Sequence, residues 1–466
     1  MKINDLTVSD SSTEIEEVYF DSRKKVKNGL YVCLKGKVDG HNYVREAMSN
    51  GAVAIVCEHS VEVDIEQIVV SDTRKALATI SASFYGNPQD KMVFVGITGT
   101  NGKTTTSYIV KSILEAHGKK CAVIGTNGCY GDKYYDTELT TPDPPKLYQT
   151  LRSLLDADYR YVVMEVSAHA AALDKVYGIP FEVAAFTNLT RDHLDYFGDM
   201  DSYGSAKRKF MISGKNAVIN VDDDFGRELL DKIPSAVTYG LYNPSDVFGI
   251  RIKMSEHGIN YILNLMDRII DVRFALTGKF NVYNTMCAAA ICHILGVNDE
   301  NIKEGIRKLK KVEGRFNIIN TTQCSIVIDF AHTPDGLSNV LKALREVTKG
   351  RIITVFGCGG NRDSGKREEM GAIASALSDF VVITSDNPRF ENPSTIIREI
   401  EKGVKVDHVA IENREYAIEY AIKRSNKGDI ILVAGKGSEK YQEINGVKHP
   451  YSDEEFVLKL VAREGI

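Results

Sequence analysis

The chain has 466 residues, a length typical of about three domains. Hydrophobic residues make up 43% of it and charged residues 26%, which favours a folded protein over a disordered or fibrous one. The net charge of -5 gives no reason to expect a nucleic acid or a membrane surface as a partner.

The spacing of the cysteines and the first residues of the chain predict the cellular compartment of the protein. The 8 cysteines are scattered without a Cys-x-x-Cys pair, and the chain starts without the apolar segment of a signal peptide. No apolar run is long enough to span a bilayer. We therefore expect a soluble, cytoplasmic protein with reduced thiols and no membrane partner.

The first part of the chain predicts a small mixed α/β domain over residues 1–90. Apolar strands are expected at 29–34 and 52–56, with a helix at 43–50 between them. Turn-forming residues at 85–90 indicate a linker to the next domain.

From residue 91 onward, short apolar strands alternate with helices. A buried strand at 91–98 precedes a helix at 104–117, and this alternation predicts a parallel sheet covered on both faces. Residues 246–276 alternate in polarity instead, which predicts a small antiparallel insert. Further strands are expected at 121–125, 161–166, 183–190 and 217–220.

A second α/β series begins at Arg315. A helix at 413–424 begins after Asn413, a plausible N-cap. The fold class is therefore α/β with a small N-terminal mixed domain, a central P-loop-type parallel sheet and a C-terminal Rossmann-like sheet. The C-terminal strands are expected at 325–330, 352–356, 380–385, 408–411 and 429–434, and the domains at 1–90, 91–314 and 315–466.

The segment between the strand at 91–98 and the next helix has the composition of a phosphate-binding loop. Glycines let backbone N–H groups surround phosphate oxygens, and the helix N-terminus favours an anion. Lys103 would neutralise the outer phosphates of ATP, and the Thr104 hydroxyl would ligate Mg²⁺. The strict pattern has its first glycine where this chain has Ile97, and a glycine-rich turn without a ligand is the alternative. The predicted loop comprises Gly99, Thr100, Asn101, Gly102, Lys103, Thr104 and Thr105.

Two further strands are expected to bring polar side chains to the same sheet edge. Glu165 ends an apolar strand, and a polar run containing His193 comes after the strand that begins at 183. Mg²⁺ prefers oxygen ligands, and ligands of such sheets bind at the carboxyl ends of the strands. The three strand ends together predict a metal–phosphate site.

These features, with several other segments, resemble the Mur ligase family, ATP-dependent ligases that form the amide bonds of the peptidoglycan stem peptide. The resemblance covers nearly the whole chain. It implies catalytic roles for Lys103, Glu165, His193 and Lys207. The segments that carry it are Met164-Glu165-Val166-Ser167, 188–195, Tyr203-x-x-Ala206-Lys207, Asn281-x-x-Asn284, Gly314-Arg315-Phe316, 329–335 and Gly435-Lys436-Gly437.

Within the family, the chain is most similar to the branch that joins a diamino acid to UDP-N-acetylmuramoyl-L-alanyl-D-glutamate. The resemblance implies that a substrate carboxylate attacks the γ-phosphate of ATP to give an acyl phosphate, which the incoming amine then attacks. It also implies contacts to ATP from Asn284, Arg315, Asp329 and His332, and to the UDP-linked peptide from Ser22, Thr140, Thr141, Ser167 and Lys175.

The resemblance also implies two Mg²⁺ sites. Thr104 and Glu165 hold the first ion, and Glu165, His193 and Lys207 hold the second. A lysine ammonium cannot ligate Mg²⁺, so the family's matching lysine carries a carbamate formed from CO₂. The alternative for Lys207 is a plain surface lysine on a helix.

The incoming amino acid is expected to be read by a loop after the strand at 380–385. An arginine there presents a planar fork that pairs with a carboxylate, such as the far one of meso-2,6-diaminopimelate. A salt-bridged loop arginine is the alternative. By resemblance, the residues that contact diaminopimelate are Arg362, Asp386, Asn387, Pro388, Arg389, Gly435 and Glu439.

The chain departs from the family pattern at Ser438, where His is usual, at Ala168, where Ser is usual, and at Lys175, where many members have Arg. Lanthionine or lysine therefore stay open as the diamino acid, as does a divergent Mur-type ligase of another pathway. A folate-tail ligase and a non-catalytic ATP-binding module are the remaining alternatives. We expect a monomer whose partners are the UDP-linked dipeptide and a diamino acid.

Overall fold

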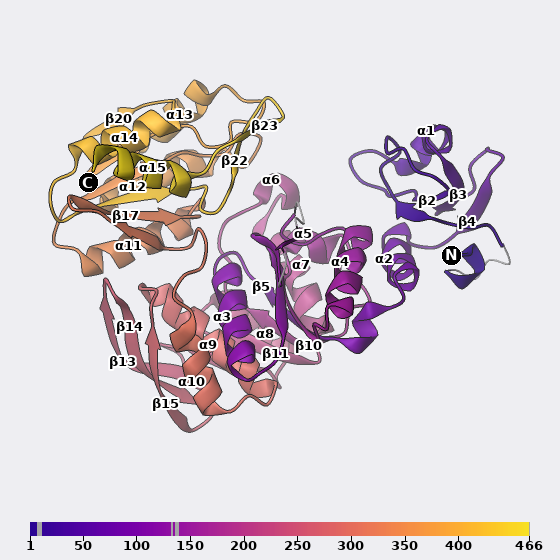
Figure 1. The fold of residues 1–466 in the computed structure, drawn as a ribbon, viewed down its shortest axis with the longest axis horizontal. Coiled ribbons are helices and arrows are strands. Elements are labelled where there is room, and N and C mark those ends of the chain that lie inside the picture. Colours follow the sequence, from indigo (N-terminus) through magenta and orange to yellow (C-terminus); the bar gives the residue numbers. More distant parts are fainter. Residues whose placement is uncertain (7–11, 132–133, 136–138, 466) are drawn as a thin grey trace. The chain divides into compact units, whose positions relative to one another are not determined.

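The computed structural model describes residues 1–6, 12–131, 134–135 and 139–465 (Figure 1). These residues divide into two units, each assembled from separate stretches of the chain. The first unit comprises Met1–Thr98, Lys119–Ala184 and Ala206–Lys215, and the second comprises Gly99–Gly118, Ala185–Ser205 and Asn216–Ile466.

The first unit begins with the predicted small α/β domain. Its sheet contains four parallel strands in sequence order, and their apolar side chains pack in clusters on both faces. Helix α2 starts after Asp72, whose carboxylate accepts hydrogen bonds from two N–H groups of the first turn. The elements are β1 Glu17–Tyr19, β2 Gly29–Val32, α1 Val44–Ser49, β3 Ala52–Cys57, β4 Glu66–Val69 and α2 Thr73–Phe84.

The rest of the first unit contains the predicted parallel strands, in the order β10-β5-β9-β6 and then the antiparallel β7 and β8. Strands β5, β6 and β9 are buried almost throughout, as expected for a sheet covered on both faces. The bounds are β5 Val93–Thr98, β6 Cys121–Gly125, β7 Gly128–Tyr130, β8 Tyr134–Tyr135, α4 Pro144–Asp156, β9 Tyr161–Glu165, α5 Ala168–Ala172, β10 Phe181–Phe186 and α7 Met200–Ser213.

The prediction of a strand as far as residue 190 is wrong, whereas the polar run predicted after this strand does begin directly after Phe186, at Thr187. The strand ends at Phe186 because the next residues bind another segment instead of the sheet. Thr187 Oγ1 donates a hydrogen bond to the carbonyl of Asn101 at 2.6 Å, and the Thr190 N–H donates to Thr100 Oγ1 at 3.0 Å.

The second unit contains the predicted antiparallel insert. Strand β14 pairs with both β13 and β15, and helices α9 and α10 pack against these strands (Figure 1). The bounds are α3 Lys103–Ala116, α6 Leu194–Phe197, β11 Asn216–Asn220, α8 Asp224–Lys232, β12 Val237–Gly240, β13 Val247–Ser255, β14 Gly258–Leu265, β15 Arg268–Phe274, α9 Lys279–Ile294 and α10 Asp299–Lys308.

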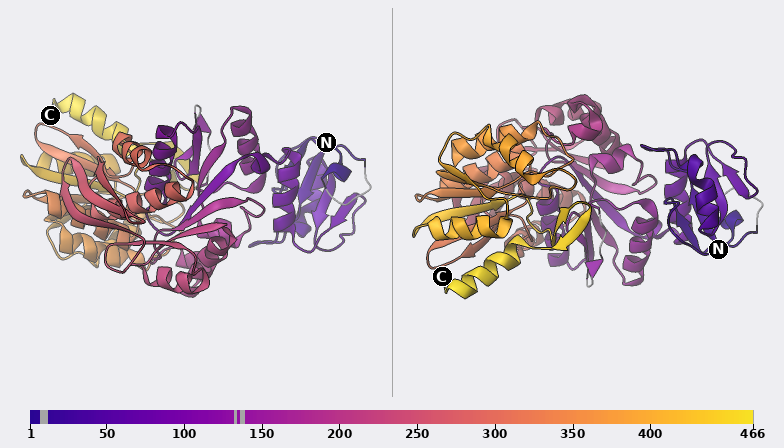
Figure 2. Two further views of the ribbon diagram at one scale, coloured as in Figure 1. Left: turned by 90° about the horizontal axis from the view of Figure 1, so that it is seen from below. Right: turned by 90° about the horizontal axis from the view of Figure 1, so that it is seen from above.

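The C-terminal sheet has the order β16-β17-β21-β18-β19-β20, parallel except for the edge strand β16. One apolar cluster joins it to α11, α12 and α13 and another joins it to α14 and α15, so helices cover both faces (Figure 2). The Asn413 side chain caps α14, as predicted. The bounds are β16 Asn317–Asn320, β17 Cys324–Asp329, α11 Pro334–Val347, β18 Ile352–Phe356, α12 Lys366–Leu377, β19 Phe380–Ile383, α13 Pro393–Glu401, β20 His408–Ala410, α14 Arg414–Arg424, β21 Asp429–Ala434, β22 Tyr441–Ile444, β23 Val447–Pro450 and α15 Asp453–Glu464.

In the part of the chain that the structure describes, no helix combines the length and apolar character that a membrane crossing requires.

A fully buried ion pair connects α14, α15 and the end of β21. Arg414 contacts Asp453 through two hydrogen bonds of 2.7 and 2.8 Å, and it donates a third to the carbonyl of Ala434 at 2.9 Å. The two side chains are 1% and 0% exposed. Each charge is therefore stable in the interior only while the other is present.

We expect Asp453→Ala to cost about 3–5 kcal/mol, because it removes the carboxylate that is hydrogen-bonded to the buried Arg414 guanidinium. Urea unfolding of the purified variant measures this. The double variant Arg414→Met, Asp453→Leu removes both charges and is expected to recover most of the loss. An Asp453→Ala protein as stable as the wild type would contradict this account.

Candidate functional site

The phosphate loop requires glycine at two positions. Gly99 has a φ of 147° and Gly102 a φ of 88°, both in the region that favours glycine. A Cβ on Gly99 would lie 1.8 Å from Thr187 Oγ1, and one on Gly102 would lie 2.6 Å from Asn284 Oδ1. The backbone thus approaches its neighbours more closely than any side chain permits.

The segment after β10 holds the loop in shape. The Thr100 N–H donates to the carbonyl of Asn188 at 2.8 Å, and the Asn101 N–H donates to Asn188 Oδ1 at 2.9 Å. Thr100 Oγ1 also donates to the carbonyl of Thr190 at 3.1 Å and lies 3.2 Å from the hydroxyl of Tyr203. These bonds preorganise the loop before any ligand arrives.

Two functional groups of the loop already have partners within the protein. Lys103 Nζ donates to the carbonyls of Gly99 and Thr100 at 2.9 and 2.8 Å. Thr104 Oγ1 accepts a hydrogen bond from Arg315 Nη2 at 2.9 Å. Arg315 therefore lies beside the loop, as predicted, and an incoming phosphate must replace these internal bonds.

Glu165 ends β9 with its carboxylate held by neutral donors. Its side chain is 1% exposed, and its two oxygens accept hydrogen bonds from the N–H and the hydroxyl of Thr126, each 3.0 Å long. A Cβ on Gly125 would lie 2.1 Å from Glu165 Oε1. None of these contacts brings a cation to the buried carboxylate. Its oxygens are therefore suited to ligate Mg²⁺.

His193 has a left-handed backbone, with a φ of 56°, directly before α6. Its Nε2 lies 3.3 Å from the carboxylate of Asp192, which also lies 3.8 Å from His332 Nε2 and 3.9 Å from Lys366 Nζ. Burial would raise the pKa of Asp192, but His332, His193 and Lys366 lower it to about 2. The carboxylate of Asp192, with its lowered pKa, therefore lies between the predicted His193 and His332.

The other predicted ATP contacts have structural partners. Asn284 Oδ1 accepts a hydrogen bond from Thr106 Oγ1 at 3.2 Å, which connects α9 to α3. Asp329 accepts hydrogen bonds from the N–H groups of Phe316 and Ala331 at 2.7 and 2.8 Å. Asp329 thus fixes the backbone directly after Arg315.

The predicted contacts to the UDP-linked peptide lie in the first unit. Thr141 Oγ1 donates to the backbone carbonyl of Glu165 at 2.8 Å and accepts from the N–H of Ser167 at 3.1 Å. Lys175 Nζ forms an ion pair with Asp143 at 2.7 Å. Within the protein, Ser22 Oγ donates a hydrogen bond to the carboxylate of Glu46. The hydroxyls of Thr140 and Thr126 form a hydrogen bond with each other.

Lys207 lies on α7 with its side chain only 1% exposed. The alternative of a plain surface lysine is therefore wrong. Thr104 and His193 belong to the second unit, whereas Glu165 and Lys207 belong to the first. Among the residues described, no group of three or more His, Cys, Asp or Glu side chains has an arrangement that would hold a metal ion.

The loop predicted to read the amino acid lies directly after β19. Asn387 is buried and donates to Glu439 Oε2 at 2.9 Å, while its Oδ1 accepts from Lys436 Nζ at 3.0 Å. Arg389 has a φ of 51°, and its Nη1 donates to the carbonyl of Gly360 at 2.9 Å. Glu443 connects Arg389 to these residues, because its N–H donates to Asn387 Oδ1 at 2.9 Å and its carboxylate lies 3.2 Å from Arg389 Nε. Asn387, Arg389 and Glu439 thus belong to one polar cluster.

Charges compensate one another in this cluster. Burial would raise the pKa of Asp386, but Lys436 and Arg414 lower it below its ordinary value. Burial raises the pKa of Glu439, against the influence of Lys436 at 2.7 Å. A Cβ on Gly435 would lie 2.5 Å from Asp386 Oδ2, so this glycine lets Asp386 approach the backbone. Arg362, also predicted here, is exposed.

Sequence reasoning missed several polar contacts to the site. Asn101 Nδ2 donates to Asp335 Oδ2 at 2.8 Å, and Arg191 pairs with Asp363 at 3.2 Å. The buried Arg367 donates to Glu391 at 2.9 Å and so supports the loop that carries Arg389. Some of these residues belong to the sequence motifs given above. Nothing in their local sequence, however, indicated which distant residue each one would contact.

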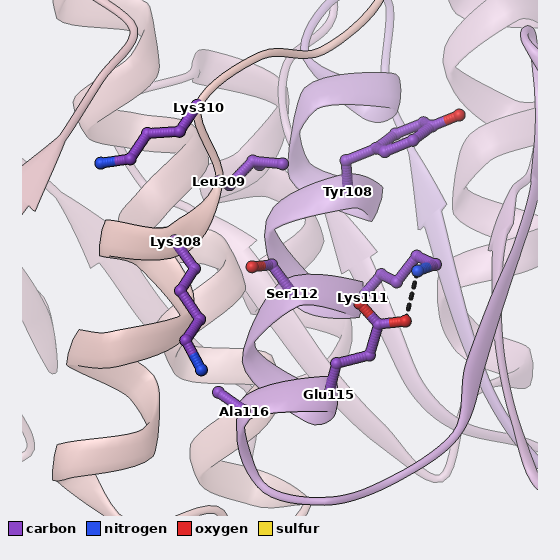
Figure 3. A pocket seen from close by; sticks show the side chains of 8 residues that line it. All are labelled: Tyr108, Lys111, Ser112, Glu115, Ala116, Lys308, Leu309 and Lys310. Carbon is purple, nitrogen blue, oxygen red and sulfur yellow. Dashed lines mark hydrogen bonds and ion pairs between the residues drawn. The ribbon is translucent and has the colours of Figure 1, made fainter.

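A pocket of about 330 Å³ lies elsewhere, between α3 and the C-terminal end of α10 with the residues just beyond it (Figure 3). Lys111 pairs with Glu115 one turn further along α3, and Lys308 lies 3.6 Å from Glu304 on α10. No residue of the predicted site lines it. The lining residues are Tyr108, Lys111, Ser112, Glu115, Ala116, Lys308, Leu309 and Lys310.

Three family models match the chain: the Mur ligase middle domain over residues 97–292, the Mur ligase glutamate ligase domain over 314–437, and the Mur ligase catalytic domain over 14–85. The chain belongs to the Mur ligase family and is an ATP-dependent ligase.

Its relatives include a UDP-N-acetylmuramoyl-L-alanyl-D-glutamate–2,6-diaminopimelate ligase from Clostridium acetobutylicum, 42% identical over 98% of this chain and 97% of the relative. A ligase of the same name from Bacillus licheniformis is 41% identical over 96% of this chain and 95% of the relative. A solved structure of such a ligase has a TM-score of 0.69 at 29% identity, covering 99% of this chain and 97% of that one.

We expect Gly99→Ala to weaken ATP binding at least about tenfold, because the added methyl group displaces Thr187 and opens the loop. Titration calorimetry measures the affinity. Gly118→Ala is the matched control: its φ is also positive, at 75°, but nothing lies within 4 Å of the new Cβ. Equal ATP affinities in the two variants would contradict the argument.

Proposed function

We propose that this chain joins meso-2,6-diaminopimelate to UDP-N-acetylmuramoyl-L-alanyl-D-glutamate with cleavage of ATP to ADP and phosphate. The cluster of Asn387, Arg389 and Glu439 after β19 is the observation that carries the choice of amino acid. Its arginine supplies a cation for a second carboxylate, and the relatives at about 40% identity bear the corresponding name. The reaction belongs to peptidoglycan precursor synthesis in the cytoplasm.

The proposed roles of the phosphate loop derive from its contacts. Lys103 leaves the carbonyls of Gly99 and Thr100 and turns to the outer phosphates, where it offsets repulsion between the attacking carboxylate and the γ-phosphate. Arg315 stays within reach of the same region because it contacts Thr104 at 2.9 Å. The carboxylate of the D-glutamyl residue becomes an acyl phosphate, and the amine of the second substrate displaces phosphate to form the amide.

Mg²⁺ would be held by Thr104 and Glu165, and a second ion by Glu165, His193 and Lys207. When bound, it would neutralise phosphate charge. The hydroxyl and carboxylate oxygens of the first pair fit the preference of Mg²⁺. Lys207 fits only as a carbamate. A lysine ammonium has no lone pair to offer a metal ion, whereas a carbamate offers two oxygens.

The proposed function also includes domain boundaries, substrate contacts and an oligomeric state. Boundaries near residues 90 and 314 define three domains, and the three family-model matches support them. The cluster of Thr141 and Ser167 beside Glu165 would receive the muramoyl peptide, with Ser22, Thr140 and Lys175. Asn284, Asp329 and His332 would contact ATP. We expect the active form to be a monomer.

Phosphate release tests the proposed function directly. With UDP-N-acetylmuramoyl-L-alanyl-D-glutamate, ATP and Mg²⁺, we expect meso-diaminopimelate to give the highest kcat/KM, at least about tenfold above lysine and ornithine, because only it offers Arg389 a far carboxylate. Lanthionine offers the same carboxylate and should rank second. Preference for lysine would overturn the assignment, and phosphate release without any acceptor would indicate a plain ATPase.

We expect Lys207→Ala to lower kcat by about 100-fold or more, because it removes the carbamate ligand. Millimolar acetate or formate should restore part of the activity by supplying a carboxylate in the vacated space. Lys209→Ala, on the same helix, loses only a half-exposed ion pair with Asp174 and is expected to keep wild-type activity. Full activity of Lys207→Ala would refute the carbamate role.

A further inference from the structure

Lys366 is a buried cation outside the predicted set of site residues. Its side chain is only 7% exposed, and the carboxylate with which it pairs, that of Asp192, lies 3.9 Å from Nζ. Within the described ranges of the chain, the Lys366 ammonium donates no hydrogen bond to another residue. An ammonium group carries three N–H donors, and burying them without acceptors is costly. This arrangement therefore points to an acceptor on a bound ligand.

The place of Lys366 in the fold favours an anion as that acceptor. Lys366 is the first residue of α12, and Gly365 before it has no side chain to cap the N–H groups of the first turn. The N-terminus of a helix attracts anions through these N–H groups and disfavours cations. A lysine at this position lies against the helix dipole and adds a full positive charge to the same place. Together these groups favour an anion with several oxygens, such as a phosphate.

Two contacts hold the start of α12 against the segment that supports the phosphate loop. Arg191 Nε lies 3.2 Å from Asp363 Oδ2, and Asp363 Oδ1 accepts a hydrogen bond from the Gly365 N–H at 2.9 Å. Arg191 belongs to the segment after β10, whose other residues bond to the phosphate loop. The phosphates of ATP are therefore the anion that the surroundings of Lys366 favour.

The neighbours of Asp192 support the same choice. His332, an expected ATP contact, lies 3.8 Å from Asp192, and the adjacent His193 is an expected Mg²⁺ ligand. Asp192 thus pairs Lys366 with groups that the phosphates and their ion would also use. When ATP binds, its γ-phosphate gives Lys366 the hydrogen-bond acceptors that the protein does not supply, while Asp192 stays paired with both histidines.

We propose that Lys366 is a further catalytic residue, whose ammonium group binds the γ-phosphate of ATP and stays with it during transfer. This inference rests on the proposed function and deepens it. A lone pair of the D-glutamyl carboxylate forms the new bond to phosphorus, the bond from phosphorus to the bridging oxygen breaks, and ADP keeps that electron pair. Lys366 gives up no proton. It acts as a fixed positive charge that offsets the repulsion between the carboxylate and the phosphate.

The test compares two nucleotides in two enzymes. In titration calorimetry with Mg²⁺ and without the peptide substrate, we expect Lys366→Met to weaken ATP binding by about tenfold or more. ADP binding should weaken by less than about threefold, because ADP lacks the γ-phosphate. In the complete reaction, kcat should fall by about 100-fold or more, while the KM for meso-diaminopimelate stays within about threefold.

The ratio of the two affinities is measured within each enzyme, so a loss of folded protein affects ATP and ADP alike. Lys423→Met is the control, because it removes the same charge from the surface of α14, where Lys423 pairs with Glu419. It should keep the wild-type ratio and kcat.

A wild-type ratio or a wild-type kcat in Lys366→Met overturns the inference and leaves the proposed function intact. A raised KM for diaminopimelate with unchanged ATP binding also overturns it, because Lys366 would then serve the amino acid. A wild type that releases no phosphate with diaminopimelate overturns the proposed function itself.

Discussion

The close approach of the phosphate loop to the segment after β10 is the constraint on which the site depends. No side chain fits at Gly99, because Thr187 Oγ1 occupies the space where a Cβ would lie. The same contact takes Thr187 out of the sheet, which is why β10 ends at Phe186. It also fixes the start of α3, and therefore where Lys103 and Thr104 emerge. One short stretch of close-packed backbone thus determines both the fold and the phosphate site.

Charges in the site are matched before any ligand is present. Asp192 lies among His193, His332 and Lys366, and Asp386 lies in the field of Lys436 and Arg414. When charge develops in a transition state, groups in such networks need to move little, because their positions are already fixed. The free-energy cost of reorganising the site is therefore small.

Glu165 differs from these groups. Its hydrogen-bond donors, the N–H and hydroxyl of Thr126, are neutral groups. Arg389 and Glu443 differ again, since they form an ion pair with each other at 3.2 Å. The structure therefore distinguishes carboxylates with cationic partners from Glu165, whose hydrogen-bond donors are neutral.

Local signals in the sequence predicted much of this molecule. The phosphate loop, the antiparallel insert and the cap of α14 at Asn413 each depend on residues close together in the chain. The polar run from residue 187 marked the end of β10, but no local signal indicated that Thr187 would bond to a residue nearly ninety positions away. The same is true of the hairpin β22–β23, whose position beside Arg389 depends on bonds to Asp386 and Asn387.

The candidate site shows the same division. Residue types and spacing suggested Lys103 and Glu165 as site residues, and family resemblance together with a place after a strand suggested Arg389. Glu443 escaped notice, since a glutamate in a short strand has no local signature, and only the fold places it 3.2 Å from Arg389. Burial distinguished Lys207 from a surface lysine, a difference that helical spacing alone did not resolve.

Transfer of an oxygen atom tests the central claim most directly. UDP-N-acetylmuramoyl-L-alanyl-D-glutamate labelled with ¹⁸O in the reacting carboxylate is turned over with ATP and meso-diaminopimelate, and the released phosphate is analysed by mass spectrometry. An acyl phosphate requires one ¹⁸O atom to leave with each phosphate and one to remain in the new amide. Phosphate free of ¹⁸O, formed alongside the labelled amide, would contradict the account.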